Sequence, residues 1–149
     1  MPVEVLAAEC HRQGMEFIAG FRMNDRHGHH PDHFEALAKV HPEWILQDYK
    51  PSWRGAPAKS HAVGCSLDYS QNGVRDLLFA IMEEITSRFD IDGIEFNFPR
   101  LLECFPLGKA EASHPIMTEF IQRVRVMLDG YGGRRLRGGK ALLFGVRVP

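Results

Sequence analysis

The stretch VRDLLFAIMEEITSRFDIDGIEFNF, residues 74–98, decides the fold because it joins a helix pattern directly to a strand pattern. In its first part, apolar residues recur at the spacing of one helical face, and they are Val74, Leu77, Leu78, Ile81, Ile85 and Phe89. In its second part, DIDGIEFNF, apolar and polar residues alternate as they do in a strand. The stretch therefore predicts a helix over 74–89 followed by a strand over 90–98.

The same alternation continues on both sides of this stretch. Upstream, the predicted elements are a helix over 3–12 that stops at Gly14, a buried strand over 15–23, a helix over 32–40, a loop over 49–60 and a strand over 61–68. Downstream, they are a helix from Met117 to Leu128 and a last strand over 140–148. Strands that alternate with crossover helices indicate a parallel sheet. The expected fold is α/β, with about four parallel strands in a single domain over 1–149.

The composition is that of a globular protein, with 44% hydrophobic and 25% charged residues. Lys and Arg number 18 against 19 Asp and Glu, which gives a net charge of −1 and argues against a nucleic-acid partner. No apolar run approaches the roughly 20 residues that span a bilayer, and the acidic N-terminus lacks the basic start of a signal peptide. We therefore expect a soluble chain without a membrane partner, and its location in the cell stays open.

Each predicted strand carries polar side chains near its carboxyl end, on the face opposite its larger apolar residues. These side chains are Arg22 and Asn24, Ser66 and Asp68, Glu95 and Asn97, and Arg147. Because chemistry in α/β folds gathers at the carboxyl ends of strands, we expect one site to collect them. Any one of them could instead form a structural ion pair, but burying the whole set without use would carry a desolvation cost that ordinary cores avoid.

Glu95 and Asp68 are the expected catalytic residues. Parallel strands lie about 4.8 Å apart, so carboxylates on neighbouring strands come within a few Å of one another. Retaining glycosidases separate their two carboxyl groups by roughly 5–5.5 Å and inverting ones by roughly 6.5–9.5 Å, and the sequence suits either. An arginine, among Arg22, Arg100 and Arg147, would hold one carboxylate ionised.

A histidine cluster beside Asp25 gives a separate hypothesis. His27, His29 and His30 resemble the H-x-H of metal-dependent barrel hydrolases, and imidazole binds zinc. The cluster lies beyond its strand, however, and no later motif completes a metal shell. The three cysteines also lack C-x-x-C spacing. We therefore expect no metal or other cofactor, and assign His29 to substrate contact.

Four aromatic residues are candidates for stacking on sugar rings, and they are Trp44, Tyr49, Trp53 and Tyr69. We keep Tyr69 and Trp53 as candidates for this role, and expect Trp44 to contribute to packing.

These motifs resemble those of the glycoside-hydrolase-like (β/α)8 (TIM) barrels, in particular the uncharacterised bacterial branch of family 10-like glycosyl hydrolases. The matching stretches cover nearly the whole chain, and they are residues 10–25, 41–46, 67–100, 117–132 and 142–149. The most specific are FRMND at 21–25 and DGIE-x-(D/N)-F-x-R at 92–100, both at strand ends. The resemblance implies a glycan cleft at the top of the barrel. Its walls would be Arg22, Asn24 and Asp25 on one side, and Asp68, Glu95 and Arg100 on the others.

Two departures limit what the resemblance implies. Where relatives usually read DGIELDF, this chain has Asn97, which hydrogen-bonds but cannot act as a nucleophile or general base at neutral pH. The chain also has 149 residues, well below the roughly 250 of a closed barrel. A half-barrel would leave open strand edges, so we expect either self-association or a missing remainder of the barrel.

The leading hypothesis is therefore a glycoside-hydrolase-like protein that acts on a glycan by carboxylate acid/base catalysis, with activity impaired by Asn97 and by truncation. Arg147 and Asn97 would contact the substrate. One alternative is a non-catalytic carbohydrate-binding or assembly module derived from such a barrel. Another is a metal-dependent hydrolase that uses His27, His29 and His30.

Overall fold

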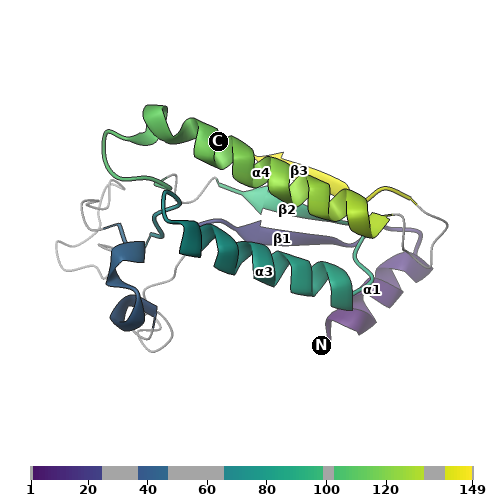
Figure 1. The fold of residues 1–149 in the computed structure, drawn as a ribbon. Helices are drawn as coiled ribbons and strands as arrows, with labels where there is room; N and C mark the ends of the chain where they lie inside the picture. The colour runs from purple at the N-terminus through teal and green to yellow at the C-terminus, as the bar shows by residue number, and fades with distance from the viewer. Residues whose placement is uncertain (1, 25–36, 47–65, 99–102, 133–139, 149) are drawn as a thin grey trace, which may run out of the picture.

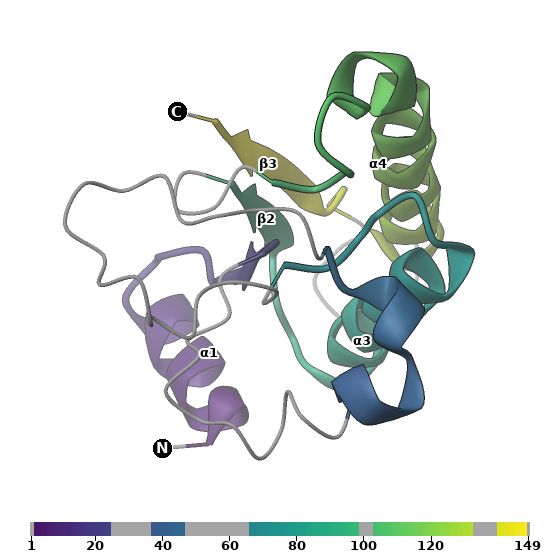
Figure 2. The ribbon, with the colours of Figure 1, turned by 90° about the vertical axis from the view of Figure 1, so that its left-hand side faces the viewer.

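The computed structural model describes residues 2–24, 37–46, 66–98, 103–132 and 140–148. Its centre is a sheet of three strands: β1 (Ile18–Arg22), β2 (Gly93–Asn97) and β3 (Leu143–Arg147). The strands are all parallel and lie in the order β1-β2-β3. Figures 1 and 2 show that two long helices, α3 (Asn72–Arg88) and α4 (Ala110–Gly132), run along one face of this sheet. The expected α/β fold with a parallel sheet is confirmed.

Most of the helix ends lie close to those predicted from the sequence. The first helix, α1, spans Val3–Arg12, and Gly14 follows it with a φ of +74°, the left-handed conformation that suits a glycine stop. The helix α3 spans Asn72–Arg88, and η1, a short 3-10 helix, covers Pro42–Trp44. The orientation of α3 differs in part from the prediction. Met82 is fully buried, whereas Leu77 and Ile81 are 37% and 40% exposed.

The fourth helix, α4, begins earlier than expected. It spans Ala110–Gly132 and contains Pro115, whereas the apolar pattern placed its start at Met117. Proline has no N–H to donate to the carbonyl four residues earlier. Here Nδ1 of His114 lies 2.6 Å from the Glu111 carbonyl oxygen, and this contact supplies the missing bond. The proline is therefore tolerated inside the helix.

The core lies between the sheet and the two long helices. Ile94 and Phe96 of β2 have no exposed surface, and the Phe96 ring centroid lies 5.9 Å from that of Phe120 on α4 and 4.9 Å from that of Phe144 on β3. This burial of aromatic and aliphatic surface is the main favourable contribution to folding. Within the described ranges, no helix has the length and apolar character needed to cross a membrane.

The prediction of a strand over 61–68 is wrong for the part that the structure describes. Leu67 forms only an isolated antiparallel bridge with Ile45, and residues 61–65 lie outside the described residues. The backbone N–H of Leu67 is held by the Asn24 side-chain oxygen at 3.0 Å, so a side chain takes the place of a neighbouring strand. The described sheet therefore has three strands, with β1 paired directly with β2.

Only the last part of the helix predicted over 32–40 can be compared with the structure. Residues 37–40 are helical, and residues 32–36 lie outside the described ranges. The N–H of His41 donates to the Leu37 carbonyl, and the chain then enters η1 at Pro42. The expected helix end at residue 40 is confirmed.

Candidate functional site

The register of the three strands arranges their polar residues in rows across one face of the sheet. Near the carboxyl ends, Arg22, Asn97 and Arg147 are register partners. One row below them, Glu95 lies between Gly20 and Gly145. The face opposite these rows carries Ile94 and Phe96, which are buried against α3 and α4, because side chains alternate along a strand. The polar rows therefore lie on the face that the two long helices do not cover.

Glu95 is held by an arginine from the neighbouring strand. Nη2 of Arg147 lies 3.2 Å from Oε1 and 3.3 Å from Oε2 of Glu95. The Glu95 side chain is 29% exposed and that of Arg147 is 59% exposed. Pairs with this much exposure contribute little to stability, so the contact acts mainly to orient the carboxylate. Arg147 is thus one of the three arginines considered from the sequence, and it contacts this carboxylate in the structure.

Glycines leave open space on both sides of Glu95. A Cβ atom built at Gly20 would meet nothing within 4 Å, and one built at Gly145 would meet only Glu95 itself, at 3.7 Å from Cγ. Any larger side chain at these two positions would stand beside the carboxylate on the same face. The glycines were not among the residues predicted from the sequence. The signal is the G-x-R pattern that both edge strands share, in IAGFR at 18–22 and LFGVR at 143–147.

Asp68 lies in a turn rather than in the sheet. Its Oδ1 accepts the backbone N–H of Ser70 at 2.8 Å, and its Oδ2 lies 3.2 Å from the Gln71 side-chain nitrogen. This arrangement is an Asx-turn that leads into α3. In the described sheet, the neighbours of β2 are β1 and β3, and Asp68 lies on neither. Asp68 and Glu95 therefore do not end adjacent strands, although the sequence pattern predicted that they would. A catalytic role of Asp68 stays a prediction.

Asn24 and Tyr69 are buried where β1 leaves the sheet. The Asn24 side chain is 2% exposed, accepts from Leu67 and donates to the Glu103 carbonyl. Tyr69 has no exposed surface, and its hydroxyl donates to the Met23 carbonyl. In this arrangement the Tyr69 ring offers no face to a sugar, and both side chains join separate segments of the chain.

Trp44 packs as expected. Its ring stacks on His41, with the centroids 3.8 Å apart, and a Cβ atom at Gly73 would lie 2.2 Å from it. Gly73 therefore allows the ring to lie against the start of α3.

Several predicted residues fall outside the described ranges. They are Asp25, His27, His29, His30, Trp53 and Arg100. Where the structure does describe side chains, no group of three or more His, Cys, Asp or Glu residues could hold a metal ion. The hypothesis of a metal site at the histidine cluster therefore stays a prediction.

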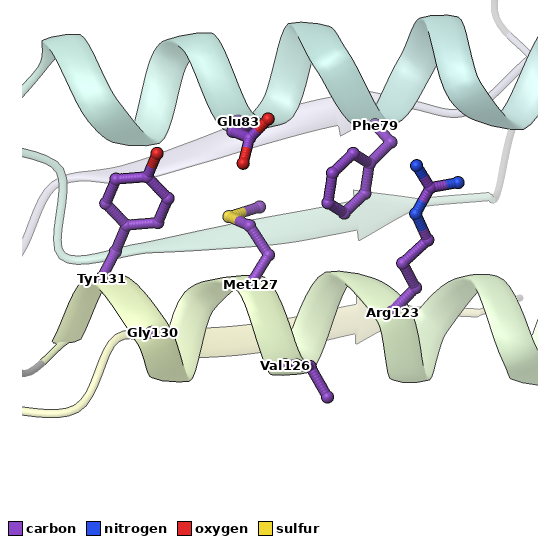
Figure 3. A pocket seen from close by; sticks show the side chains of 7 residues that line it. All are labelled: Phe79, Glu83, Arg123, Val126, Met127, Gly130 and Tyr131. Carbon is purple, nitrogen blue, oxygen red and sulfur yellow. The ribbon is translucent and has the colours of Figure 1, made fainter.

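A separate cavity of about 490 Å³ lies between α3 and α4 (Figure 3). Phe79, Met127 and Tyr131 give it an apolar lining, and Glu83 and Arg123 add charges. The Arg123 guanidinium lies 4.0 Å from the Phe79 ring centroid and is paired with Asp76. No residue predicted to bind substrate lines this cavity, so it is distinct from the polar rows on the sheet.

No protein-family model matches the chain, and no curated protein shows detectable similarity to it. Solved structures of several glycoside hydrolases are similar to it. The galactosidase domain of an α-galactosidase–sucrose kinase, AgaSK, is 21% identical over 97% of this chain, with a TM-score of 0.55. A noncanonic maltogenic α-amylase, AmyB from Thermotoga neapolitana, is 21% identical over 98%, with a TM-score of 0.58. The α-L-fucosidase isoenzyme 2 from Paenibacillus thiaminolyticus is 16% identical over 97%, with a TM-score of 0.58.

At these identities the likeness concerns the fold alone, and it supports a glycosidase-like fold. The chain spans 18% of the length of the AgaSK structure, 27% of that of AmyB and 22% of that of the fucosidase. It therefore corresponds to one part of much longer proteins. The narrower resemblance to family 10-like glycosyl hydrolases stays a prediction.

Proposed function

We propose that this chain forms part of a glycan-binding cleft in a glycoside-hydrolase-like protein, with Glu95 as its acid/base carboxylate. The observation that carries the proposal is the placement of Glu95. The residue lies on the face of the parallel sheet opposite α3 and α4, with a glycine on each neighbouring strand and Arg147 against its oxygens. A partly exposed carboxylate with free space beside it can approach a glycosidic oxygen or a water molecule.

The surrounding residues supply hydrogen-bond donors and acceptors for the hydroxyl groups of a sugar. Asn97, Arg22 and Arg147 stand one row closer to the carboxyl ends of the strands than Glu95. An amide both donates and accepts hydrogen bonds, and a guanidinium offers five donors, so this row can bind ring hydroxyl groups. A carboxylate below a row of hydrogen-bonding groups fits the acid/base chemistry of glycoside hydrolysis, and the similar glycoside hydrolase structures support the same class.

A panel of chromogenic glycosides tests this proposal on the whole chain. Glu95→Gln keeps the size of the side chain and removes the proton transfer, so we expect turnover to fall by about 100-fold or more. Glu83 is an exposed carboxylate on α3, so Glu83→Gln is the matched control and should leave turnover unchanged. Turnover that survives in Glu95→Gln would exclude Glu95 from the chemistry.

The same panel decides the role of the second carboxylate. If Asp68 takes part in the reaction, Asp68→Asn should lower turnover while the melting temperature stays close to that of the parent chain. If it serves only the Asx-turn, stability and turnover should fall together. Asn97→Asp would place a new carboxylate one row from Glu95, and we expect it to raise turnover if the asparagine limits the reaction.

A non-catalytic glycan-binding module is the second candidate, and one observation favours it. Among the described residues on the uncovered face of the three strands, Glu95 is the only carboxylate. Two carboxyl groups are usual for glycoside hydrolysis. Glycan binding that is equal in the parent chain and in Glu95→Gln, without turnover in either, would favour this candidate.

A further inference from the structure

We propose that the cavity between α3 and α4 binds a small organic cation, namely an ammonium group carried on an apolar body. The cavity has a volume of about 490 Å³, within the roughly 300–1,000 Å³ that is typical of small-molecule sites. It lies on the helix side of the sheet, away from the face that carries Glu95. The inference is therefore independent of the proposed function.

Helical spacing brings the lining side chains into the gap between the two helices. Phe79 and Glu83 are four residues apart on α3, and Arg123, Met127 and Tyr131 follow one another at the same interval on α4. Residues at this interval lie on one face of a helix. Figure 3 shows the rings of Phe79 and Tyr131 on either side of Glu83 and Met127. Because Met127 is only 8% exposed, it gives the cavity an apolar floor.

The end of the cavity at Arg123 is already balanced in charge. The guanidinium of Arg123 pairs with Asp76 on α3 and lies 4.0 Å from the Phe79 ring centroid. This cation therefore has both a carboxylate and an aromatic ring as partners within the protein. A charged ligand would gain little by binding at this end.

The other end of the cavity, at Glu83 and Tyr131, carries polar groups without partners. Among the described residues, neither the Glu83 carboxylate nor the Tyr131 hydroxyl has a hydrogen-bond or ion-pair partner, and no cation or second ring contacts the Tyr131 ring. Within the described lining, Glu83 therefore supplies one negative charge that no neighbouring side chain balances.

This second end has the chemistry of a cation site. An ammonium group is attracted to the face of an aromatic ring and to a carboxylate, and Tyr131 and Glu83 supply one of each. Tyr131 is eight residues beyond Arg123, which is about 12 Å along a helix axis. That separation exceeds the Debye length of about 8 Å at physiological ionic strength, so Arg123 would repel the bound cation only weakly. The apolar body of the ligand would lie against Phe79 and Met127.

Three ligands of similar size test the inference on the whole chain. Phenylethylamine, which is protonated at pH 7, phenylethanol and phenylpropanoate each carry a phenyl ring on a short alkyl tether, and they differ in charge. Titrations followed by NMR should show about ten-fold tighter binding of the amine than of the alcohol, the combined effect of a cation–π contact and an ion pair. The carboxylate should bind more weakly than the alcohol. The preference for the amine should fall as salt is added.

Three variants locate the source of this preference. Glu83→Gln should lower the affinity for the amine to that for the alcohol and leave the alcohol unaffected. Tyr131→Leu keeps an apolar side chain and removes the ring, so the affinity for the amine should fall by about two- to five-fold. Glu84→Gln is the matched control, because Glu84 is an exposed carboxylate of α3 that pairs with Arg88 and does not line the cavity. It should bind the amine like the parent chain, and melting temperatures report whether each variant folds.

The outcomes that overturn the inference are distinct from those that bear on the glycan cleft. Equal binding of the amine and the alcohol, or no binding of any of the three ligands, would overturn the cation site. A preference that persists in Glu83→Gln, or that falls by the same factor in Glu84→Gln, would overturn the assignment to this cavity. Turnover of glycosides concerns the other face of the sheet, so it stays a separate test of Glu95.

Discussion

At the scale of single residues, two glycines of the sheet differ in what a methyl group would meet. A Cβ atom at Gly93 would lie 2.4 Å from the Leu143 carbonyl oxygen on the neighbouring strand. That oxygen belongs to paired backbone, so it can move only if β2 and β3 separate. We expect Gly93→Ala to lower the free energy of unfolding by about 1–3 kcal/mol, the usual cost of overpacking, as measured by urea denaturation.

Gly145→Ala is the matched control. Its Cβ atom would stand 3.7 Å from Cγ of Glu95, an ordinary van der Waals distance. Glycine weakens the interior of a strand, so alanine here should leave stability unchanged or slightly raised. Equal losses at both positions would show that the contact with Leu143 is not what makes Gly93 necessary.

Cys104 provides a second prediction at this scale. Burial raises the pKa of its thiol from 9.0 to about 12, although a hydrogen bond from Asn24 acts in the opposite direction. The thiolate is the reactive form of cysteine. We therefore expect iodoacetamide at pH 8 to modify Cys104 much more slowly than the partly exposed Cys10, as measured by peptide mass mapping. Similar rates at the two residues would contradict the prediction.

The raised pKa of Cys104 also predicts how stability depends on pH. The unfolded chain releases the thiol proton near pH 9, whereas the folded chain keeps it up to about pH 12. The contribution of this thiol to stability is therefore complete below pH 9 and is lost as the pH rises from 9 to 12. The difference in unfolding free energy between the parent chain and Cys104→Ala should shift accordingly, against the parent, over this window.

At the scale of elements, His11 ties α1 to the residues that lead into β2, because it contacts Asp92 and, with Nδ1 at 3.6 Å from Oδ2, Asp90. Oδ2 of Asp92 lies 2.6 Å from Nε2 of His11 and accepts the N–H of Phe17 at 2.7 Å. The His11 side chain is only 4% exposed, so little water is available to replace these bonds. Asp92→Ala should lower the free energy of unfolding by about 1–3 kcal/mol. It should also speed hydrogen exchange in Val3–Arg12, as measured by mass spectrometry.

Arg12→Ala provides the comparison for this prediction. Arg12 is 68% exposed and pairs with Glu9 on α1 itself, and such surface pairs contribute little. Hydrogen exchange in α1 should therefore stay close to that of the parent chain. Faster exchange of the same size in both variants would mean that α1 depends on its own helical contacts rather than on Asp92.

Elements with a strong local pattern could be predicted from the sequence, and those determined by distant contacts could not. The predicted helix over 74–89 matches α3 at Asn72–Arg88 to within two residues, because its apolar spacing is repeated over several turns. The start of α4 was missed because its apolar spacing begins only at Met117, and the bond from His114 that makes Pro115 tolerable depends on the three-dimensional structure. Leu67 was assigned to a strand because apolar and polar residues alternate over 61–68. In the structure its N–H instead donates to the side-chain oxygen of Asn24, which is distant in the sequence.

At the scale of the whole molecule, the site depends on register, which the sequence indicates only in part. Alternation correctly placed Glu95 and Asn97 on one face of β2, and Arg147 near the end of the last strand, β3. Alternation alone could not show that β1 pairs directly with β2, which brings Gly20 and Arg22 beside those residues. For the same reason, alternation could not predict where Asp68 lies relative to Glu95, because the neighbours of a strand are determined by the whole sheet.

The uncovered face of the sheet also predicts association of the chain. Its row near the amino ends contains Ile18 and Leu143, which are 37% and 47% exposed, so apolar surface faces water there. Two chains that meet through these faces would bury the apolar row and leave the row of Arg22, Asn97 and Arg147 at the carboxyl ends of the strands outside the contact. We expect the sedimentation-derived mass to rise with concentration, and the double variant Ile18→Asp/Leu143→Asp to stay monomeric. Val126→Asp, at a 71% exposed position on α4, should associate like the parent chain. A parent chain that is monomeric at every concentration would mean that this apolar row is not a contact between copies.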